Sequence, residues 1–387
     1  MAETIRAYLD HGASAPLDAR MRGVMAQALE CVGGPDALHP AGAAAARMLE
    51  AARAQIAALI DCDPDDVIFT SGATEARNLA LKGLLAANRP LGTHLVVSAV
   101  EHPAVMSIAR SRLRDGGPVS ITAVDSAGRI DGAALAGAVG SQTCLVSIHH
   151  AQHEVGTIQD LSELIGAVRG RRGEVRVHVD ASESAGTLEV DVAALGADAV
   201  TLGGPALGAP AWAGALWLRA GARLHPLIEG GAQEAGKRAG PVDLAAAVAL
   251  GAAAEHVRAV RAQRAARLRR QTGFLADRVL AVPDVRLNGP PVRERLPGHL
   301  QVSVRGVTGE SLALALATRG VCVSPGSTCS ADAGKASPTL EAMGVDPSWT
   351  HGAILMTLGD STTDDELGVA ADAFIAAVAD LRAMSPL

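Results

Sequence analysis

Short apolar runs that alternate with helical stretches constrain the fold of this chain more than any other feature of its sequence. Most of the runs are about four to eight residues long and continuously apolar, as expected for strands buried on both faces. They fall at residues 65–70, 94–100, 143–151, 174–180, 197–203 and 214–219. Because stretches rich in alanine, leucine and arginine separate several of these runs, the order predicts an α/β fold with a mainly parallel sheet and helices on both sides.

The chain is long enough for two domains. Its 387 residues allow a large core and a second, smaller one. We expect a large domain at 16–250 that contains the predicted sheet. Residues 242–282 are typical of a long helix with a basic face. This helix leads into a smaller α+β domain, which we expect to combine 1–15 with 251–387.

Charge and hydropathy argue against several classes of partner. The formal net charge of −7 argues against nucleic acid. The longest apolar runs are broken well short of the ~20 residues that span a bilayer. The acidic N-terminal stretch, 1–10, lacks the apolar core of a signal peptide. We therefore expect a cytoplasmic protein without nucleic-acid or membrane partners.

The cysteines indicate free thiols rather than a disulfide framework. The five are scattered along the chain as Cys31, Cys62, Cys144, Cys322 and Cys329. An odd, scattered set is typical of a reducing compartment. None belongs to a Cys/His cluster with zinc spacing, so we predict no metal site. Cys329 lies in a loop of small residues and is a better nucleophile candidate than the other four.

Three further side chains lie at turns where ligands commonly bind. Thr74 belongs to a turn between a strand and a helix, where backbone N–H groups and a hydroxyl either bind a phosphate or simply cap the helix. His102 follows a strand, where a lone histidine either binds a ligand or has a purely structural role. Asp180 ends a strand at the carboxyl edge, where open α/β sheets bind ligands.

The order of these motifs resembles that of the cysteine desulfurases, a class V branch of the fold-type I enzymes that use pyridoxal phosphate (PLP). The segments that carry the resemblance are 7–18 (AYLDHGASAPLD), 67–83 (VIFTSGATEARNLALKG), 97–105 (VSAVEHPAV), 153–161 (HEVGTIQDL), 178–186 (HVDASESAG) and 324–344. They span nearly the whole chain. The resemblance implies a PLP-transferase-like fold whose large domain holds a mostly parallel seven-stranded sheet, beside a smaller α+β domain.

The resemblance also implies roles for individual residues. Thr74 matches the phosphate-side turn, His102 the histidine that stacks on the PLP ring, and Asp180 the aspartate that pairs with the pyridine nitrogen. Glu183 stands where the family has a glutamine, near the position of the ring's phenolate. Cys329 matches the cysteine that carries the persulfide.

Several positions depart from the family pattern. Ala206 stands where the family has the lysine that forms the Schiff base with PLP. The other replaced positions are Gly203, Pro205 and Pro241 at the phosphate, Leu355 at the arginine that clamps the substrate carboxylate, and Asp360 at a further arginine. Each lost charge-assisted phosphate bond is worth roughly 1.5–3 kcal/mol.

Without the lysine, PLP has no covalent anchor, and catalysis lacks its proton-transfer base. The chain has three lysines, Lys82, Lys237 and Lys335, and none is at a strand end facing Asp180. We therefore expect no covalently bound PLP and no cofactor.

Several hypotheses for the function follow. The first is a pseudoenzyme of sulfur relay or scaffolding that needs no PLP, with Cys329 as a persulfide carrier. An alternative is an enzyme with new chemistry in the remodelled pocket, where the acid and base groups are His102, His153, Asp180 and Glu183. A second alternative is a genuine PLP-dependent cysteine desulfurase. The plainest hypothesis, separate from these, is that Cys329 is an inherited remnant with no present role.

The expected partners follow from the same resemblance. Desulfurases of this fold are dimers, and the segment 229–238 (EGGAQEAGKR) keeps the character of the family's interface loop. We expect a homodimer or a heterodimer with a related subunit, and a protein that donates or accepts sulfur.

Overall fold

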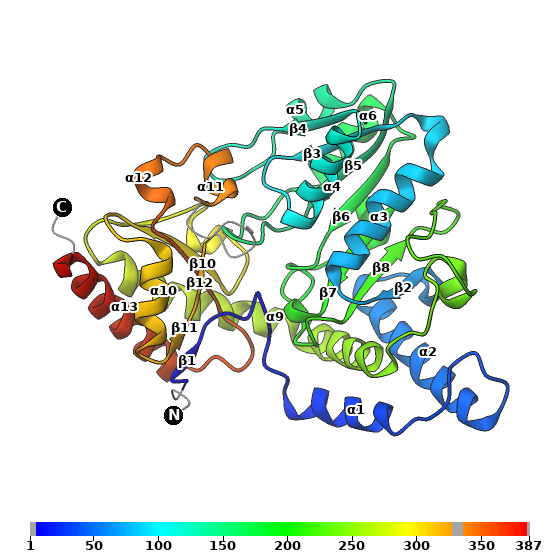
Figure 1. Cartoon of the computed structure of the whole chain (residues 1–387), viewed down its shortest axis with the longest axis horizontal. Coiled ribbons are helices and arrows are strands. Elements are labelled where there is room, and N and C mark those ends of the chain that lie inside the picture. The colour runs from blue at the N-terminus through cyan, green and yellow to red at the C-terminus, as the bar shows by residue number, and fades with distance from the viewer. Residues whose placement is uncertain (1–4, 327–335, 385–387) are drawn as a thin grey trace.

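A seven-stranded sheet forms the centre of the larger part of the molecule (Figure 1). The computed structural model describes residues 5–326 and 336–384. In spatial order the strands are β2 (Val67–Thr70), β8 (Gly214–Leu218), β7 (Ala199–Gly203), β6 (Arg176–Asp180), β5 (Thr143–His149), β3 (His94–Ser98) and β4 (Val119–Thr122). Strand β8 runs antiparallel to both of its neighbours, and the β7–β6–β5–β3–β4 pairs are parallel. The predicted α/β class and mostly parallel sheet are confirmed.

Helices cover both faces of this sheet (Figure 1). On one face lie α3 (Ala73–Ala87) and α4 (Pro103–Arg114); on the other lie α2 (Pro40–Ile60), α5 (Gly132–Ala138), α6 (Leu161–Arg171) and the first half of α9 (Leu244–Leu280). The adjacent residues Leu145 and Val146 of β5 point into these two different cores, and both are fully buried. Burial on both faces explains why the strands appear in the sequence as continuous apolar runs.

A second core lies around a four-stranded sheet in the other part of the molecule (Figure 1). Its strands are β12 (Ser324–Pro325), β13 (Ala353–Thr357), β10 (His299–Val304) and β9 (Val285–Leu287), and the nearby helices are α10 (Gly309–Ala317), α11 (Pro338–Ala342), α12 (Pro347–Thr350) and α13 (Asp364–Met384). Strand β1 (Ala7–Tyr8) pairs with β11 (Val321–Cys322), which joins the N-terminal segment to this part. The long helix expected at 242–282 is α9, which contacts both cores. The expected domain boundary at residue 250 falls inside α9 and stays a prediction.

Short elements connect the rest of the described chain. They are α1 (Ala19–Leu29), α7 (Val192–Leu195), α8 (Gly204–Leu207), η1 (Pro64–Asp66), η2 (Arg89–Leu91), η3 (Gln233–Gly236) and η4 (Val292–Glu294). Helix α8 is a single turn directly after β7, so it places Ala206 beside the carboxyl edge of the sheet. Gly204 permits this turn, because a Cβ there would lie 2.0 Å from the Pro210 carbonyl oxygen.

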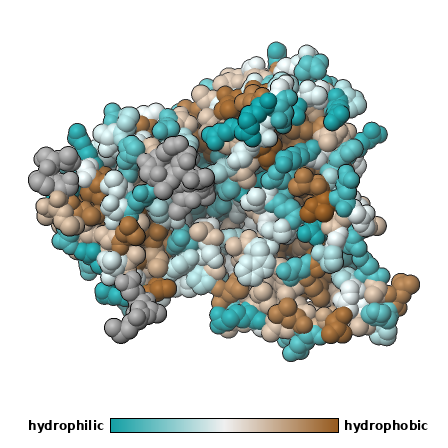
Figure 2. Space-filling view, in the orientation of Figure 1, coloured by the Kyte–Doolittle hydropathy of each residue, from teal (hydrophilic) through white to brown (hydrophobic). Residues whose placement is uncertain are grey.

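The helices that the structure describes include no candidate for a membrane-spanning segment. None of the helices in 5–326 and 336–384 is both long and apolar enough for that. On the face shown in Figure 2, hydrophobic side chains form separate small groups among hydrophilic ones.

Gly204→Ala should destabilise the fold by about 3 kcal/mol or more, because the new methyl group overlaps the Pro210 carbonyl in a packed region. Urea denaturation measures this loss. The control is Gly166→Ala in α6, where no atom lies within 4 Å of the added Cβ. That change should stabilise the protein by about 0.4–1 kcal/mol. Equal effects of the two substitutions would contradict the close approach at Gly204.

Candidate functional site

A buried ion pair between Asp180 and Arg77 lies at the centre of the candidate site. Asp180 ends β6, and Arg77 lies near the start of α3. The Arg77 Nε donates to Asp180 Oδ2 at 2.5 Å, and the two side chains are only 3% and 4% exposed. Burial by itself raises the pKa of Asp180, but the charge and hydrogen bond of Arg77 outweigh it and hold this pKa well below its ordinary value. Asp180 is therefore ionised at neutral pH.

Arg77 is a site residue that sequence reasoning missed. Its guanidinium also donates to Ser182 Oγ, so one side chain ties the start of α3 to the segment after β6. The signal was a basic residue inside the 71–78 motif, SGATEARN. That motif was interpreted through its backbone N–H groups and the Thr74 hydroxyl, so the charge of Arg77 was not considered.

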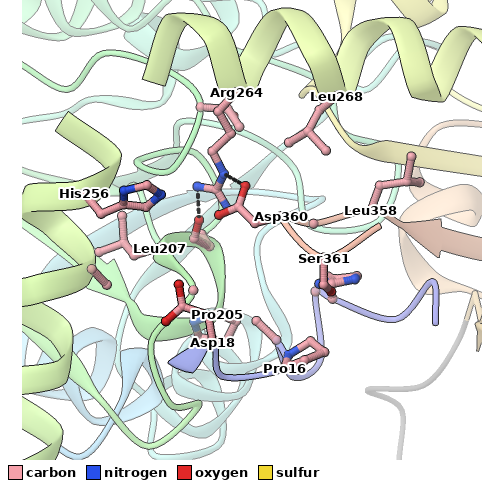
Figure 3. Close-up of a pocket in the computed structure, with 18 of the residues that line it drawn as sticks. Pro16, Asp18, Pro205, Leu207, His256, Arg264, Leu268, Leu358, Asp360 and Ser361 are labelled. Atoms are coloured by element: carbon pink, nitrogen blue, oxygen red, sulfur yellow. Dashed lines mark hydrogen bonds and ion pairs between the residues drawn. The ribbon is translucent and has the colours of Figure 1, made fainter. Parts of the chain in front are cut away.

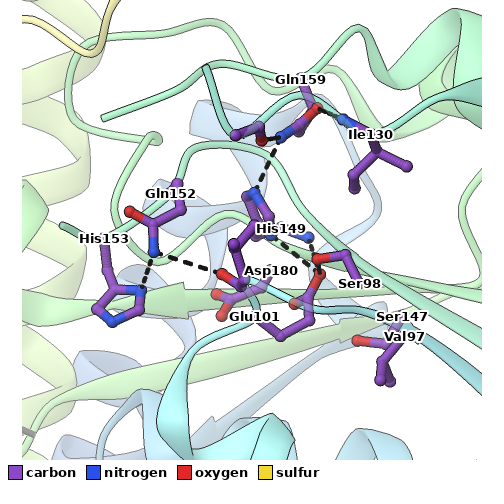
Figure 4. Close-up of polar contacts among 12 residues, drawn as sticks. Val97, Ser98, Glu101, Ile130, Ser147, His149, Gln152, His153, Gln159 and Asp180 are labelled. Atoms are coloured by element: carbon purple, nitrogen blue, oxygen red, sulfur yellow. Dashed lines mark hydrogen bonds and ion pairs between the residues drawn. The ribbon is translucent and has the colours of Figure 1, made fainter. Parts of the chain in front are cut away.

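Two neutral histidines lie beside the ion pair. His102 is the N-cap of α4, where its Nδ1 accepts from the Ala104 N–H at 3.1 Å. Its ring centroid is 5.0 Å from that of His153, and Gln152 Nε2 lies 3.1 Å from His153 Nδ1 (Figure 4). Burial lowers the pKa of His102 to about 3 and that of His153 well below its ordinary value, and the charge of Arg77 acts in the same direction. Both rings are uncharged at pH 7.

Glu183 differs from these groups because it has no partner. It finds no hydrogen bond or ion pair among the described residues, and it lines a cavity of about 360 Å³ together with Ala206. Burial raises the pKa of Glu183 to about 7, and the like charge of Asp180 adds to this effect while Arg77 opposes it. Glu183 is therefore able to hold or release a proton near neutral pH.

Arg264 builds another wall of the same cavity (Figure 3). From α9, its Nε donates to Asp360 Oδ1 at 2.9 Å, and its Nη1 donates to the carbonyl oxygens of Gly186 and Ala206, both at 2.8 Å. The side chain is 6% exposed. A buried cation thus fixes the backbone of Ala206. Sequence reasoning missed Arg264 because no local pattern marks a residue whose partners are far away along the chain.

The turn expected to bind phosphate is present at the start of α3, and Thr74 lies exposed in its first turn. Gly72 is the N-cap with φ of 106°, and no side chain caps the helix there. Across from it, a Cβ on Gly203 would lie 3.1 Å from Ser182 Cβ and 3.3 Å from Ala73 Cβ. A serine at position 203 would therefore need its neighbours to move by a few tenths of an ångström.

The structure brings Asp180, His102 and Glu183 together around Arg77, as the interactions that shift their pKa values show. Cys329, the candidate persulfide carrier, lies outside the described residues, as does Lys335. The lysines that the structure describes are Lys82 on α3 and Lys237, and neither lines the cavity beside Ala206.

This fold and site define a class of protein. The family model of class V aminotransferases matches residues 7–366, and the chain belongs to that family. Among its curated relatives, the chain is similar to proteins named cysteine desulfurase. It is 37% identical over 381 residues to cysteine desulfurase IscS 1 of Archaeoglobus fulgidus, which covers 98% of this chain and 99% of that protein. It is 36% identical over 386 residues to cysteine desulfurase IscS of Klebsiella pneumoniae, covering 98% and 94%. The protein is thus cysteine desulfurase-like.

Solved structures agree with this assignment. A NifS-like protein superposes with a TM-score of 0.91 at 28% identity, covering 97% of this chain and all of that chain. DndA of Streptomyces lividans superposes with a TM-score of 0.76 at 28% identity, covering 92% and 98%. The PLP-transferase-like fold implied by the sequence motifs is confirmed.

The expectation that the chain takes no cofactor is wrong for a member of this family. Class V aminotransferases and the cysteine desulfurases to which the chain is similar depend on PLP, so PLP is the expected cofactor. The expectation gave the missing lysine too much weight, because a cofactor ring is also held by contacts that form no covalent bond.

The residues present fit PLP in part. Asp180 is ionised, and although Arg77 bonds one carboxylate oxygen and the Ser182 N–H the other, each oxygen keeps a further lone pair for a ring nitrogen. His102 lies beside it, and the N–H groups at the start of α3 suit a phosphate. When bound, PLP withdraws electrons from the carbon that bears a substrate's amino group. Ala206 offers no amine for attachment.

Glu183→Gln should remove a pH dependence of stability. The pKa of Glu183 is raised from 4.5 to about 7 in the folded chain. Its contribution to stability is therefore complete below about pH 4.5 and is lost as the pH rises through 7. The variant, which cannot ionise there, should gain on the order of 2–3 kcal/mol over wild type between pH 4.5 and pH 8.

Urea denaturation of both proteins across this pH range measures the difference. The control is Glu189→Gln, whose side chain is 80% exposed and which should follow wild type. A difference between Glu183→Gln and wild type that stays constant with pH would contradict the raised pKa.

Proposed function

We propose that this chain is a sulfur-transfer protein of the cysteine desulfurase type that receives sulfur at Cys329 instead of cleaving cysteine itself. Ala206 carries the proposal, because the family's lysine at this position is both the covalent anchor of PLP and a base that moves protons. Its backbone is held by Arg264, and no described lysine lines the adjoining cavity.

The substrate side of the site supports the same proposal. Leu355 stands where the family's arginine would pair with a substrate carboxylate, and it lies buried in β13 between β10 and β12. A leucine offers no hydrogen bond to a carboxylate, so free cysteine loses a bidentate partner there. A persulfide delivered by a protein donor needs no such contact.

The proposed step is a thiol exchange that conserves atoms and charge. The Cys329 thiolate attacks the terminal sulfur of a donor's protonated persulfide. A new S–S bond forms on Cys329, the donor's S–S bond breaks, and the donor cysteine leaves as a thiolate. No external oxidant or reductant takes part.

Three of the four thiols that the structure describes are poor competitors for this step. Burial raises the pKa of Cys62 to about 12, with nearby aspartates adding to the effect. Burial also raises the pKa values of Cys144 and Cys322. Because the thiolate is the reactive form, these three are disfavoured at neutral pH, which leaves Cys31 as the comparison for Cys329.

Cys329 should be the most readily alkylated thiol and should gain one sulfur from a PLP-dependent cysteine desulfurase supplied with cysteine. Cysteine alone should not load it. Mass spectrometry of the tryptic peptide would show a sulfur-mass adduct that is absent from Cys329→Ser. If Cys31 or Cys322 labels first, or if cysteine alone loads Cys329, sulfur relay is not the function.

No PLP should be attached covalently to the purified protein, even when PLP is added. The reason is the methyl group of Ala206 at the attachment position. Borohydride reduction followed by intact mass measurement tests this. A phosphopyridoxyl adduct would overturn the expectation and point to Lys82, Lys237 or Lys335. Ala206→Lys alone should not create desulfurase activity, since Gly203 and Leu355 remain.

A second candidate function is new acid–base chemistry in the cavity beside Ala206. Glu183 favours it, because an unpartnered carboxyl group with a pKa of about 7 is suited to proton transfer at neutral pH. This function gains support if Glu183→Gln abolishes the cellular activity of the protein while Cys329→Ser leaves it intact. A genuine PLP-dependent desulfurase is the outcome if cysteine alone loads Cys329.

The assembly and location remain predictions. We expect a homodimer or a heterodimer with a related subunit, a sulfur donor or acceptor protein as partner, and the cytoplasm as the compartment. Sulfur relay requires at least the donor contact.

A further inference from the structure

The residues on either side of segment 327–335 lie near the same two side chains, Gln301 and Glu154. On the incoming side, the Gly326 N–H donates to the Ala353 carbonyl at 3.1 Å. A Cβ on Gly326 would lie 2.7 Å from Ala353 Cβ and 3.1 Å from Gln301 Nε2. The chain therefore leaves the described structure directly against the side chain of Gln301.

On the returning side, the chain is bonded to Glu154. Ser337 Oγ donates to Glu154 Oε2 at 2.6 Å, and Thr339 Oγ1 donates to Oε1 at 2.7 Å. Gln301 Nε2 donates to the same carboxylate, to Oε2 at 3.2 Å. Gln301 thus lies beside the incoming end at Gly326 and donates to the same carboxylate that Ser337 and Thr339 of the returning end bond.

Glu154 is an unusual acceptor because its hydrogen-bond donors are all neutral. The residue is 9% exposed, and no described arginine or lysine pairs with it. A buried carboxylate without a cation depends on hydrogen bonds from hydroxyl and amide groups for its stability. Two short hydrogen bonds, from Ser337 and Thr339, therefore satisfy this buried carboxyl group.

Glu154 also touches the candidate site. Its Oε1 lies 3.5 Å from His153 Nε2, a buried nitrogen that makes no hydrogen bond with the described residues. His153 in turn contacts the ring of His102. A continuous set of contacts runs from Thr339 through Glu154 to the histidines beside Asp180.

We propose that Glu154 is a positioning residue that fixes the returning end of the segment carrying Cys329 and ties this end to the histidine side of the pocket. The position of this returning end rests on the contacts of Ser337 and Thr339 with Glu154. Its value for sulfur transfer rests on the function proposed for Cys329, and the two are tested separately.

The endoprotease Lys-C measures the anchor directly, because the chain has three lysines and Lys335 lies two residues before Ser337. Glu154→Ala should speed cleavage after Lys335 by about tenfold or more, since it removes two buried hydrogen bonds that restrain local opening. Cleavage after Lys237 in the same sample is the internal reference and should keep its wild-type rate. Equal acceleration at both sites, or none at Lys335, would overturn the proposal.

Two further variants guard against a general loss of folding. Thr339→Val keeps the side-chain shape and removes one donor, so it should speed cleavage after Lys335 less than Glu154→Ala does, and the double variant should resemble Glu154→Ala alone. Glu341→Ala, an exposed residue of the same short helix, is the matched control and should cleave like wild type. Additive effects of Thr339→Val and Glu154→Ala would contradict a shared contact.

Sulfur loading separates positioning from simple exposure. Relative to wild type, Glu154→Ala should lower the rate at which a donor desulfurase loads Cys329 by about tenfold, while iodoacetamide alkylation falls no more than about twofold. Equal loading in both proteins would refute the positioning role. If wild type is not loaded at all, sulfur relay fails, and the Lys-C result still decides the anchor.

Discussion

The site depends on one buried ion pair, that of Arg77 with Asp180. It joins the start of α3 to the end of β6, and its two charges act on the ionisable groups around it. Removing one partner of a buried pair typically costs about 3–5 kcal/mol, because the other charge is left without compensation. The guanidinium also helps to keep His102 and His153 uncharged, and the carboxylate helps to raise the pKa of Glu183.

Much of the architecture could be predicted from the sequence, because strands buried on both faces leave continuous apolar runs. The runs at 174–180 and 197–203 became β6 and β7, and Asp180 was placed correctly at a strand end. Arg77 and Arg264 could not be found in this way. Each acts through partners far along the chain, such as Asp180 for Arg77, and only the folded structure brings them together.

The conclusion about PLP shows where such reasoning goes too far. From Ala206, sequence analysis expected no cofactor, whereas the family to which the chain belongs uses PLP. Binding of the PLP ring and its covalent attachment are two separate questions, and the structure bears on each through different residues. Asp180 and His102 remain suited to a ring, while the family resemblance assigns Ala206 to the attachment position and Leu355 to the carboxylate-binding position. We propose that the machinery acting on free cysteine has been lost, whereas the hydrogen bonds from Ser337 and Thr339 to Glu154 are present.

The formation of alanine from cysteine tests this account most directly, because a protein that moves the sulfur of free cysteine onto its own thiol as a persulfide leaves alanine as the other product. The purified chain would be incubated with PLP, L-cysteine and a thiol reductant, and alanine quantified over many hours. The account predicts no alanine beyond that of PLP and cysteine without protein. Alanine that accumulates over several turnovers and disappears in Cys329→Ser would contradict it, and would make the chain a genuine desulfurase that works without a lysine at position 206.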